Sequence, residues 1–233
     1  MTPQAQPARH WWRLAGLAWG AVNLAALAGG LFPRLITLGA SAESSAELPT
    51  LQSLLACQVG FLLLIYPMIL AGRAAREYPR ASLGRLLRHF FLEMILWLVV
   101  ALPFLVVAAY LANATPRDAG RSMLLVVGAF LAAWGLALLA GRGAGGMSLS
   151  VLVSVLAVLG LPAAWYLTSP DFLPAQPGWL WDLAPTLFAW STAHERIASW
   201  LPVPLWALIL WPAIGLAMIF LHLIRPPADQ ARQ

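Results

Sequence analysis

The chain has 233 residues, of which 61% are hydrophobic and only 10% are charged, and its mean hydropathy is +0.78. Its net charge of +5 comes from fourteen basic residues, all of them arginine. This composition excludes an ordinary soluble domain, and because no basic patch interleaved with aromatic residues is present, it also argues against nucleic-acid binding.

Six apolar stretches follow one another along the chain, each close to the roughly 20 residues that a helix needs to cross a bilayer core. They cover residues 14–32, 51–71, 90–112, 123–141, 147–168 and 204–224. A spanning segment must satisfy its own backbone hydrogen bonds, which favours helices. The sequence therefore predicts an all-α polytopic membrane protein with six transmembrane helices, in which residues 1–233 form a single transmembrane domain.

The arginines are distributed unevenly between the segments that join these spans. Four lie on one side of the predicted membrane: Arg34, Arg117, Arg121 and Arg196. The other ten lie on the opposite side: Arg9, Arg13, Arg73, Arg76, Arg80, Arg85, Arg88, Arg142, Arg225 and Arg232. The positive-inside rule then predicts that both termini are cytoplasmic. Exclusive use of arginine suggests a high-GC bacterial genome, so we expect the bacterial inner membrane.

Small residues in the first two spans suggest close packing. Gly16 and Gly20 in the first span permit close approach of another helix. Cys57, in the second span, is the one cysteine of the chain and is expected to serve packing, because no intramolecular disulfide can form.

The connection between the second and third spans is basic and amphipathic. Pro79 should end the preceding helix. After it, apolar residues recur at helical spacing, with Arg85, Arg88 and His89 on the other side of the same helix. The apolar residues are Leu83, Leu86, Leu87, Phe90 and Phe91. This short cytoplasmic helix is either an interfacial element that contacts anionic lipid headgroups or a docking helix for a soluble partner.

Few polar side chains fall inside the spans. Asn23 and Gln58 are expected to form interhelical hydrogen bonds. Glu93 is the candidate functional carboxylate, because an ionised group in the membrane costs at least about 2.5 kcal/mol. Pairing with His89, one helical turn away, or extension of the carboxylate toward the surface would explain Glu93 structurally. A role in moving a proton or a substrate is the alternative.

The outer connection between the fifth and sixth spans is rich in tryptophan and proline. It contains Trp179, Trp181, Trp190 and Trp200, interrupted by Pro185. Indole rings favour the headgroup level of a membrane. The segment is therefore predicted to form a re-entrant or interfacial helical hairpin, which is either an aromatic belt with a surface loop, or a lid over a translocation path or docking face for an outer partner.

Motifs for catalysis and cofactor binding are not found in the sequence. The glycine-rich stretch 141–148 lacks the lysine of a nucleotide-binding loop. The four histidines are scattered over both sides of the membrane, and no Gly-x-Ser-x-Gly sequence occurs. We therefore expect no cofactor, no metal and no catalytic residue in this chain. A weaker hypothesis is an intramembrane enzyme that uses Glu93 or the His194–Glu195 pair.

In its arrangement the chain resembles the permease subunits of ABC type-2 transporters. The resemblance rests on six spans, on the basic segment from Arg73 to His89 and on the hairpin from Trp179 to Trp200. The family often carries a Gly-Thr-Leu-Glu-like element in the first cytoplasmic loop, whereas residues 81–84 read Ala-Ser-Leu-Gly here.

The resemblance implies a permease subunit that couples a partner ATPase to movement of a substrate or of force across the membrane. Its partners would be a cytoplasmic nucleotide-binding ATPase, a second permease subunit and membrane lipids. The residues that would dock the ATPase are Arg73, Arg76, Arg80, Leu83, Arg85, Leu86 and Arg88. The alternative is a non-catalytic integral membrane subunit of a respiratory or assembly complex.

Overall fold

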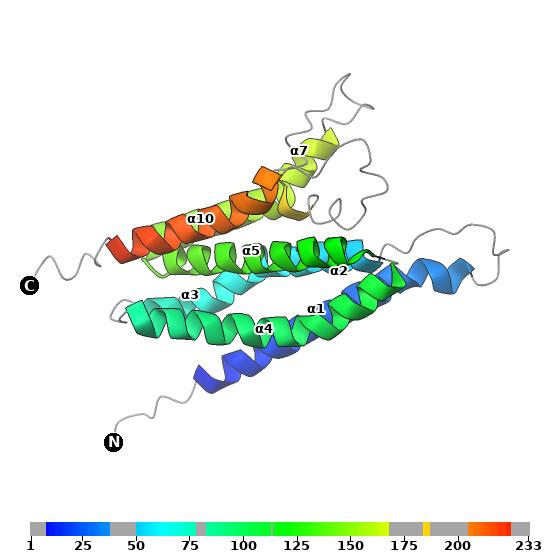
Figure 1. Ribbon diagram of the computed structural model, residues 1–233. Helices are drawn as coiled ribbons and strands as arrows, with labels where there is room; N and C mark the ends of the chain where they lie inside the picture. The colour runs from blue at the N-terminus through cyan, green and yellow to red at the C-terminus, as the bar shows by residue number, and fades with distance from the viewer. Residues whose placement is uncertain are drawn as a thin grey trace, which may run out of the picture.

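All elements that the computed structural model defines in the described part of the chain are helices (Figure 1). The structure describes residues 8–37, 50–77, 83–112, 114–167, 184–186 and 205–224. The helices are α1 (Ala8–Thr37), α2 (Thr50–Gly60), α3 (Tyr66–Glu77), α4 (Leu83–Leu111), α5 (Pro116–Ala140), α6 (Ala144–Val155), α7 (Leu161–Leu167) and α10 (Leu205–Ile224). Two π-helical turns, η1 (Phe61–Ile65) and η2 (Leu156–Gly160), join α2 to α3 and α6 to α7.

Among the described residues, four helical segments are long and apolar enough to cross a membrane. They are Thr50–Ala71, Gly84–Leu111, Pro116–Ala140 and Ala144–Ala164. Two further apolar helices, Ala15–Leu31 and Leu208–His222, are shorter. All six overlap the apolar stretches of the sequence. The all-helical prediction is confirmed for the described residues, and the four long apolar helices suggest a membrane protein, although spanning length is reached by four helices and not by the predicted six.

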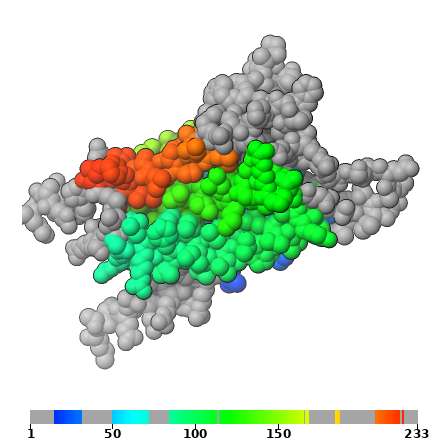
Figure 2. Space-filling view, viewed as in Figure 1, coloured from blue at the N-terminus to red at the C-terminus, as the bar shows by residue number. Residues whose placement is uncertain are grey.

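The outward face of α4 is apolar, as expected for a helix in contact with lipid. Leu92, Ile95, Leu96 and Val99 are each more than half exposed, and the apolar segment of α4 is only 22% buried. In water such a continuous apolar face would be a severe aggregation risk, whereas lipid solvates it. Figure 2 shows α4, α5 and α10 together on one face of the molecule.

The central helix is α5. Its apolar segment is 72% buried, because α10, α3 and α6 all pack against it. Its N-terminus is fixed by a capping box, in which the Thr115 hydroxyl accepts from the Asp118 backbone N–H and the Asp118 carboxylate accepts from the Thr115 N–H. These contacts make α5 the helix that holds α3, α6 and α10 in one bundle.

Glycines let α5 and α10 approach closely. A Cβ at Gly215 would lie 2.5 Å from the carbonyl of Leu131, and one at Gly135 would lie 2.9 Å from the carbonyl oxygen of Gly215. In contrast, a Cβ at Gly16 or Gly20 would meet nothing within 4 Å. The close helix approach expected at the first span therefore does not occur at these two glycines.

The termini of several helices lie together on one side of the bundle. In Figure 1 the start of α1, the end of α3, the start of α4, the α5–α6 turn and the end of α10 all lie on the left. The Arg142 guanidinium in the α5–α6 turn donates to the Leu221 carbonyl near the end of α10, at 2.8 Å. The first and last helices thus have their terminal ends on the same side of the bundle.

Candidate functional site

Glu93 lies inside the bundle at the contact of three helices. Its carboxylate oxygen Oε2 accepts a hydrogen bond of 2.7 Å from the Tyr66 hydroxyl, at the start of α3. The same oxygen accepts one of 3.1 Å from the Trp134 indole N–H, on α5. Only 5% of Glu93 is exposed. The carboxylate is therefore held inside the bundle and does not extend toward the membrane surface.

Aromatic rings pack against the two residues that donate to this carboxylate. Trp97 meets Tyr66 edge-on with ring centroids 4.9 Å apart, and Phe90 meets Trp134 edge-on at 5.4 Å. Phe130 packs against both Tyr66 and Phe90, at 5.5 Å. A hydrogen bond in such apolar surroundings is electrostatically stronger than one in water. We call Glu93, Tyr66 and Trp134 the Glu93 cluster.

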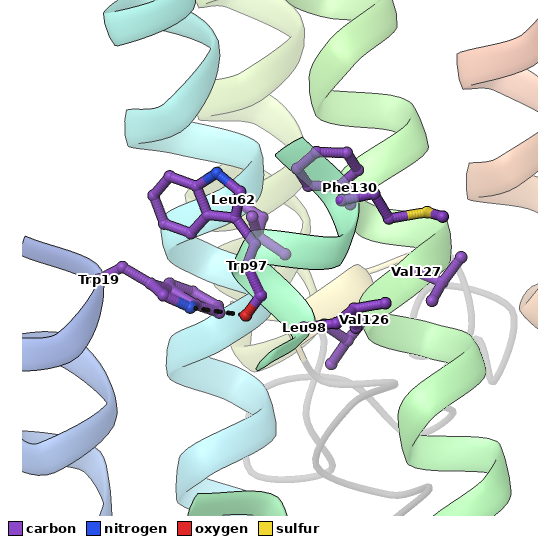
Figure 3. A pocket seen from close by; sticks show the side chains of 8 residues that line it. Trp19, Leu62, Trp97, Leu98, Val126, Val127 and Phe130 are labelled. Carbon is purple, nitrogen blue, oxygen red and sulfur yellow. Dashed lines mark hydrogen bonds between the residues drawn. The ribbon is translucent and has the colours of Figure 1, made fainter. Parts of the chain in front are cut away.

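A very small cavity lies beside the aromatic rings (Figure 3). Its volume is about 10 Å³, which is room for about one water molecule. Residues of four helical segments line it, including Trp19, Leu62, Trp97, Val126 and Phe130. Its walls are almost entirely apolar. A cavity of this size and lining is a packing defect and holds no substrate.

A second polar contact connects α1 with α2. The Gln58 side-chain amide donates to Asn23 Oδ1 at 2.6 Å, and the Asn23 amide donates to the Trp19 carbonyl at 2.8 Å. The Trp19 indole N–H in turn donates to the Trp97 carbonyl on α4, at 3.3 Å. Asn23 and Gln58 are both fully buried. The two amides that the sequence predicted to bond between helices are thus brought together with each other.

Removing this contact should destabilise the α1–α2 pair modestly. We expect Gln58→Leu to lower the free energy of unfolding by roughly 0.6 to 2 kcal/mol, as for other interhelical hydrogen bonds in membranes. The measurement is a double-mutant cycle with Asn23→Leu, in detergent micelles. If the two substitutions were simply additive, the bond would contribute nothing.

The basic segment forms the end of α3 and the start of α4. Arg73 and Arg76 belong to α3, and Arg85 and Arg88 are exposed on α4. Leu86 is only 2% exposed and packs into the bundle. Leu83 begins α4, and Arg80 lies outside the described residues. In the predicted apolar stripe Leu86 and Phe90 are buried, while Leu87 and Phe91 face outward.

The amphipathic segment and the third span are one uninterrupted helix, because α4 begins at Leu83 and continues to Leu111. His89 is half-buried one turn before Glu93. Its pairing with Glu93 stays a prediction. Glu93 is the eleventh residue of a 29-residue helix, so it lies about 15 Å along α4.

The remaining predicted site residues lie elsewhere. Trp179, Trp181, Trp190 and Trp200, like the His194–Glu195 pair, are outside the described residues. Within the described ranges, no group of three or more His, Cys, Asp and Glu side chains could hold a metal ion.

Tyr66 and Trp134 were missed by the sequence reasoning. Both carry a polar atom on an otherwise apolar side chain, and the count of polar residues inside the spans included only amides, acids and histidine. A hydroxyl or an indole N–H in the middle of a span needs a hydrogen-bond partner as much as an amide does. That requirement is the signal that could have identified them.

No family model, no characterised protein and no solved structure matches this chain. The resemblance to ABC type-2 permeases therefore rests on the arrangement of the sequence alone.

Proposed function

We propose that this chain is the membrane-spanning permease subunit of an ABC-type transporter. It couples a cytoplasmic partner ATPase to movement of a substrate or of force across the bacterial inner membrane, in association with a second permease subunit. ATP hydrolysis belongs to the partner.

In this proposal α1 and α10 also cross the membrane, which gives six spans with both termini in the cytoplasm. Their lengths support it, since 30 and 20 residues correspond to about 45 and 30 Å of helix. Arginine is in excess at the end of the bundle where α1 begins and α10 ends. This excess supports a cytoplasmic location of that end.

The observation that carries the proposal is the continuity of α4. Arg85 and Arg88 are exposed at its start, and Glu93 on the same helix bonds to Tyr66 and Trp134. A push on the basic end would reach α3 and α5 through this cluster, because a helix moves as a rigid rod over such a short length. The arginines would bind an acidic groove on the ATPase.

Reversing the charge of the docking segment should abolish this coupling. We expect the triple variant Arg80→Glu, Arg85→Glu, Arg88→Glu to insert normally and to lose co-purification with a P-loop ATPase from native membranes. The matched control replaces the same three residues with lysine, which keeps the charge and should largely retain the ATPase.

Mass spectrometry of the purified complex decides between the proposals. An ATPase that stays bound to the glutamate variant would refute docking at this segment. Redox or assembly subunits without any ATPase would instead support a non-catalytic subunit of a respiratory or assembly complex.

A further inference from the structure

Two helices of the bundle change from α to π geometry over five residues. The backbone N–H of Tyr66 bonds to the carbonyl of Phe61, five residues earlier, and the N–H of Leu161 bonds in the same way to the carbonyl of Leu156. Each five-residue turn is continuous with α-helix on both sides. Such π turns inside α-helices are rare and are found frequently at functional sites.

A proline accounts for each π turn. Pro67 follows η1 by two residues and Pro162 follows η2 by two residues. Proline has no N–H to donate, and its ring would clash with the carbonyl four residues earlier in an α-helix. Widening the preceding turn relieves this clash. The same spacing in both helices gives them the same mechanical weak point.

The two π turns lie next to each other. η1 contacts both η2 and α6. At Gly60, directly before η1, an added Cβ would lie 3.8 Å from a methyl carbon of Val158 in η2. This is ordinary van der Waals distance, so the two weak points are packed against each other at the same depth in the bundle.

The first π turn is also connected to the Glu93 cluster. Tyr66 is the residue that closes η1, and its hydroxyl bonds to Glu93 on α4. A rotation of α3 about η1 displaces this hydroxyl. The hydrogen bond therefore holds α3 in the position seen here.

We propose that η1 and η2 form a paired hinge, about which α3 and α7 move together, and that the Tyr66–Glu93 hydrogen bond is its latch. Sharp kinks in helices, those above about 20°, occur almost always at features such as prolines and π turns. For the 12 residues of α3, a change of this size moves the far end by about 6 Å. The hinge is a property of this chain alone and needs no partner ATPase.

Distances between spin labels test the hinge in the purified chain in lipid nanodiscs. Labels on Arg76→Cys in α3 and Ala144→Cys at the start of α6 report the movement, in a Cys57→Ser background because Cys57 is exposed. We expect two distances in the parent chain, separated by about 6 Å. Tyr66→Phe, which keeps the ring and removes the latch, should shift the population toward the second distance.

Removing the prolines should lock the hinge. We expect Pro67→Ala to give a single distance between the labels on α3 and α6. Pro162→Ala should have the same effect on this distance, because the two π turns are packed together. Pro103→Ala in α4 is the matched control, since Pro103 lies inside a helix without a π turn, and it should leave the distances unchanged.

Three outcomes would overturn the proposal. A single distance in both the parent chain and Tyr66→Phe would show that there is neither a hinge nor a latch. An effect of Pro67→Ala without one of Pro162→Ala would show that the hinges are not paired. Hydrogen exchange of the unaltered chain gives a test that needs no variant, because amides 62–66 should exchange faster than amides 126–130 of α5, and equal rates would contradict the hinge.

Discussion

Replacing Gly215 with leucine should detach α10 from α5 and strongly destabilise the bundle. A Cβ at this position already meets the backbone of Leu131 and Ala132 at 2.5 to 2.6 Å, so no side-chain rotation relieves the clash. Overpacking typically costs about 1 to 3 kcal/mol in soluble cores, and occasionally more. We expect the free energy of unfolding to decrease by at least about 3 kcal/mol, because the clash is with backbone.

The unfolding of the purified protein in mild detergent, followed by circular dichroism, measures this effect. Gly16→Ala on α1 is the matched control, since a Cβ there meets nothing within 4 Å and alanine favours the helix. We expect Gly16→Ala to unfold with the parent chain or slightly above it. Equal stability of Gly215→Leu would mean that α10 does not pack on α5 through this glycine.

Replacing Glu93 with leucine should remove an acceptor that two buried donors share. The Tyr66 hydroxyl and the Trp134 indole N–H both donate to the same carboxylate oxygen, and both residues are almost fully buried. Leaving a buried donor unsatisfied costs about 1 to 3 kcal/mol. We expect Glu93→Leu to lower the free energy of unfolding by about 2 to 4 kcal/mol.

Glu93→Gln is the matched control, because it keeps the shape and an acceptor oxygen, and it should cost clearly less. A cycle with Tyr66→Phe separates the bond from the packing, since Glu93→Leu should be less damaging when the hydroxyl is already absent. Additive effects of the two substitutions would mean that the Tyr66–Glu93 bond does not stabilise the fold.

The sequence by itself determined the helical segments. Hydropathy is a property of successive residues, so the apolar stretches at 51–71 and 90–112 coincide with Thr50–Ala71 and with the apolar part of α4. The amphipathic start of α4 was also predictable, because helical spacing puts Leu86 and Phe90 on one face and Arg85 and Arg88 on another. The boundary of the helix differs from that of the span, because α4 begins seven residues before the predicted third span.

Only the tertiary structure decided which polar groups meet and which helices touch. Nothing in the order of residues says that Glu93 bonds to Tyr66 and Trp134, because these lie 27 and 41 residues away along the chain. The glycines show the same limit, since Gly16 and Gly215 look alike in sequence, yet one faces open space and the other a backbone. Contacts between helices depend on how the whole bundle packs, which a local sequence pattern does not specify.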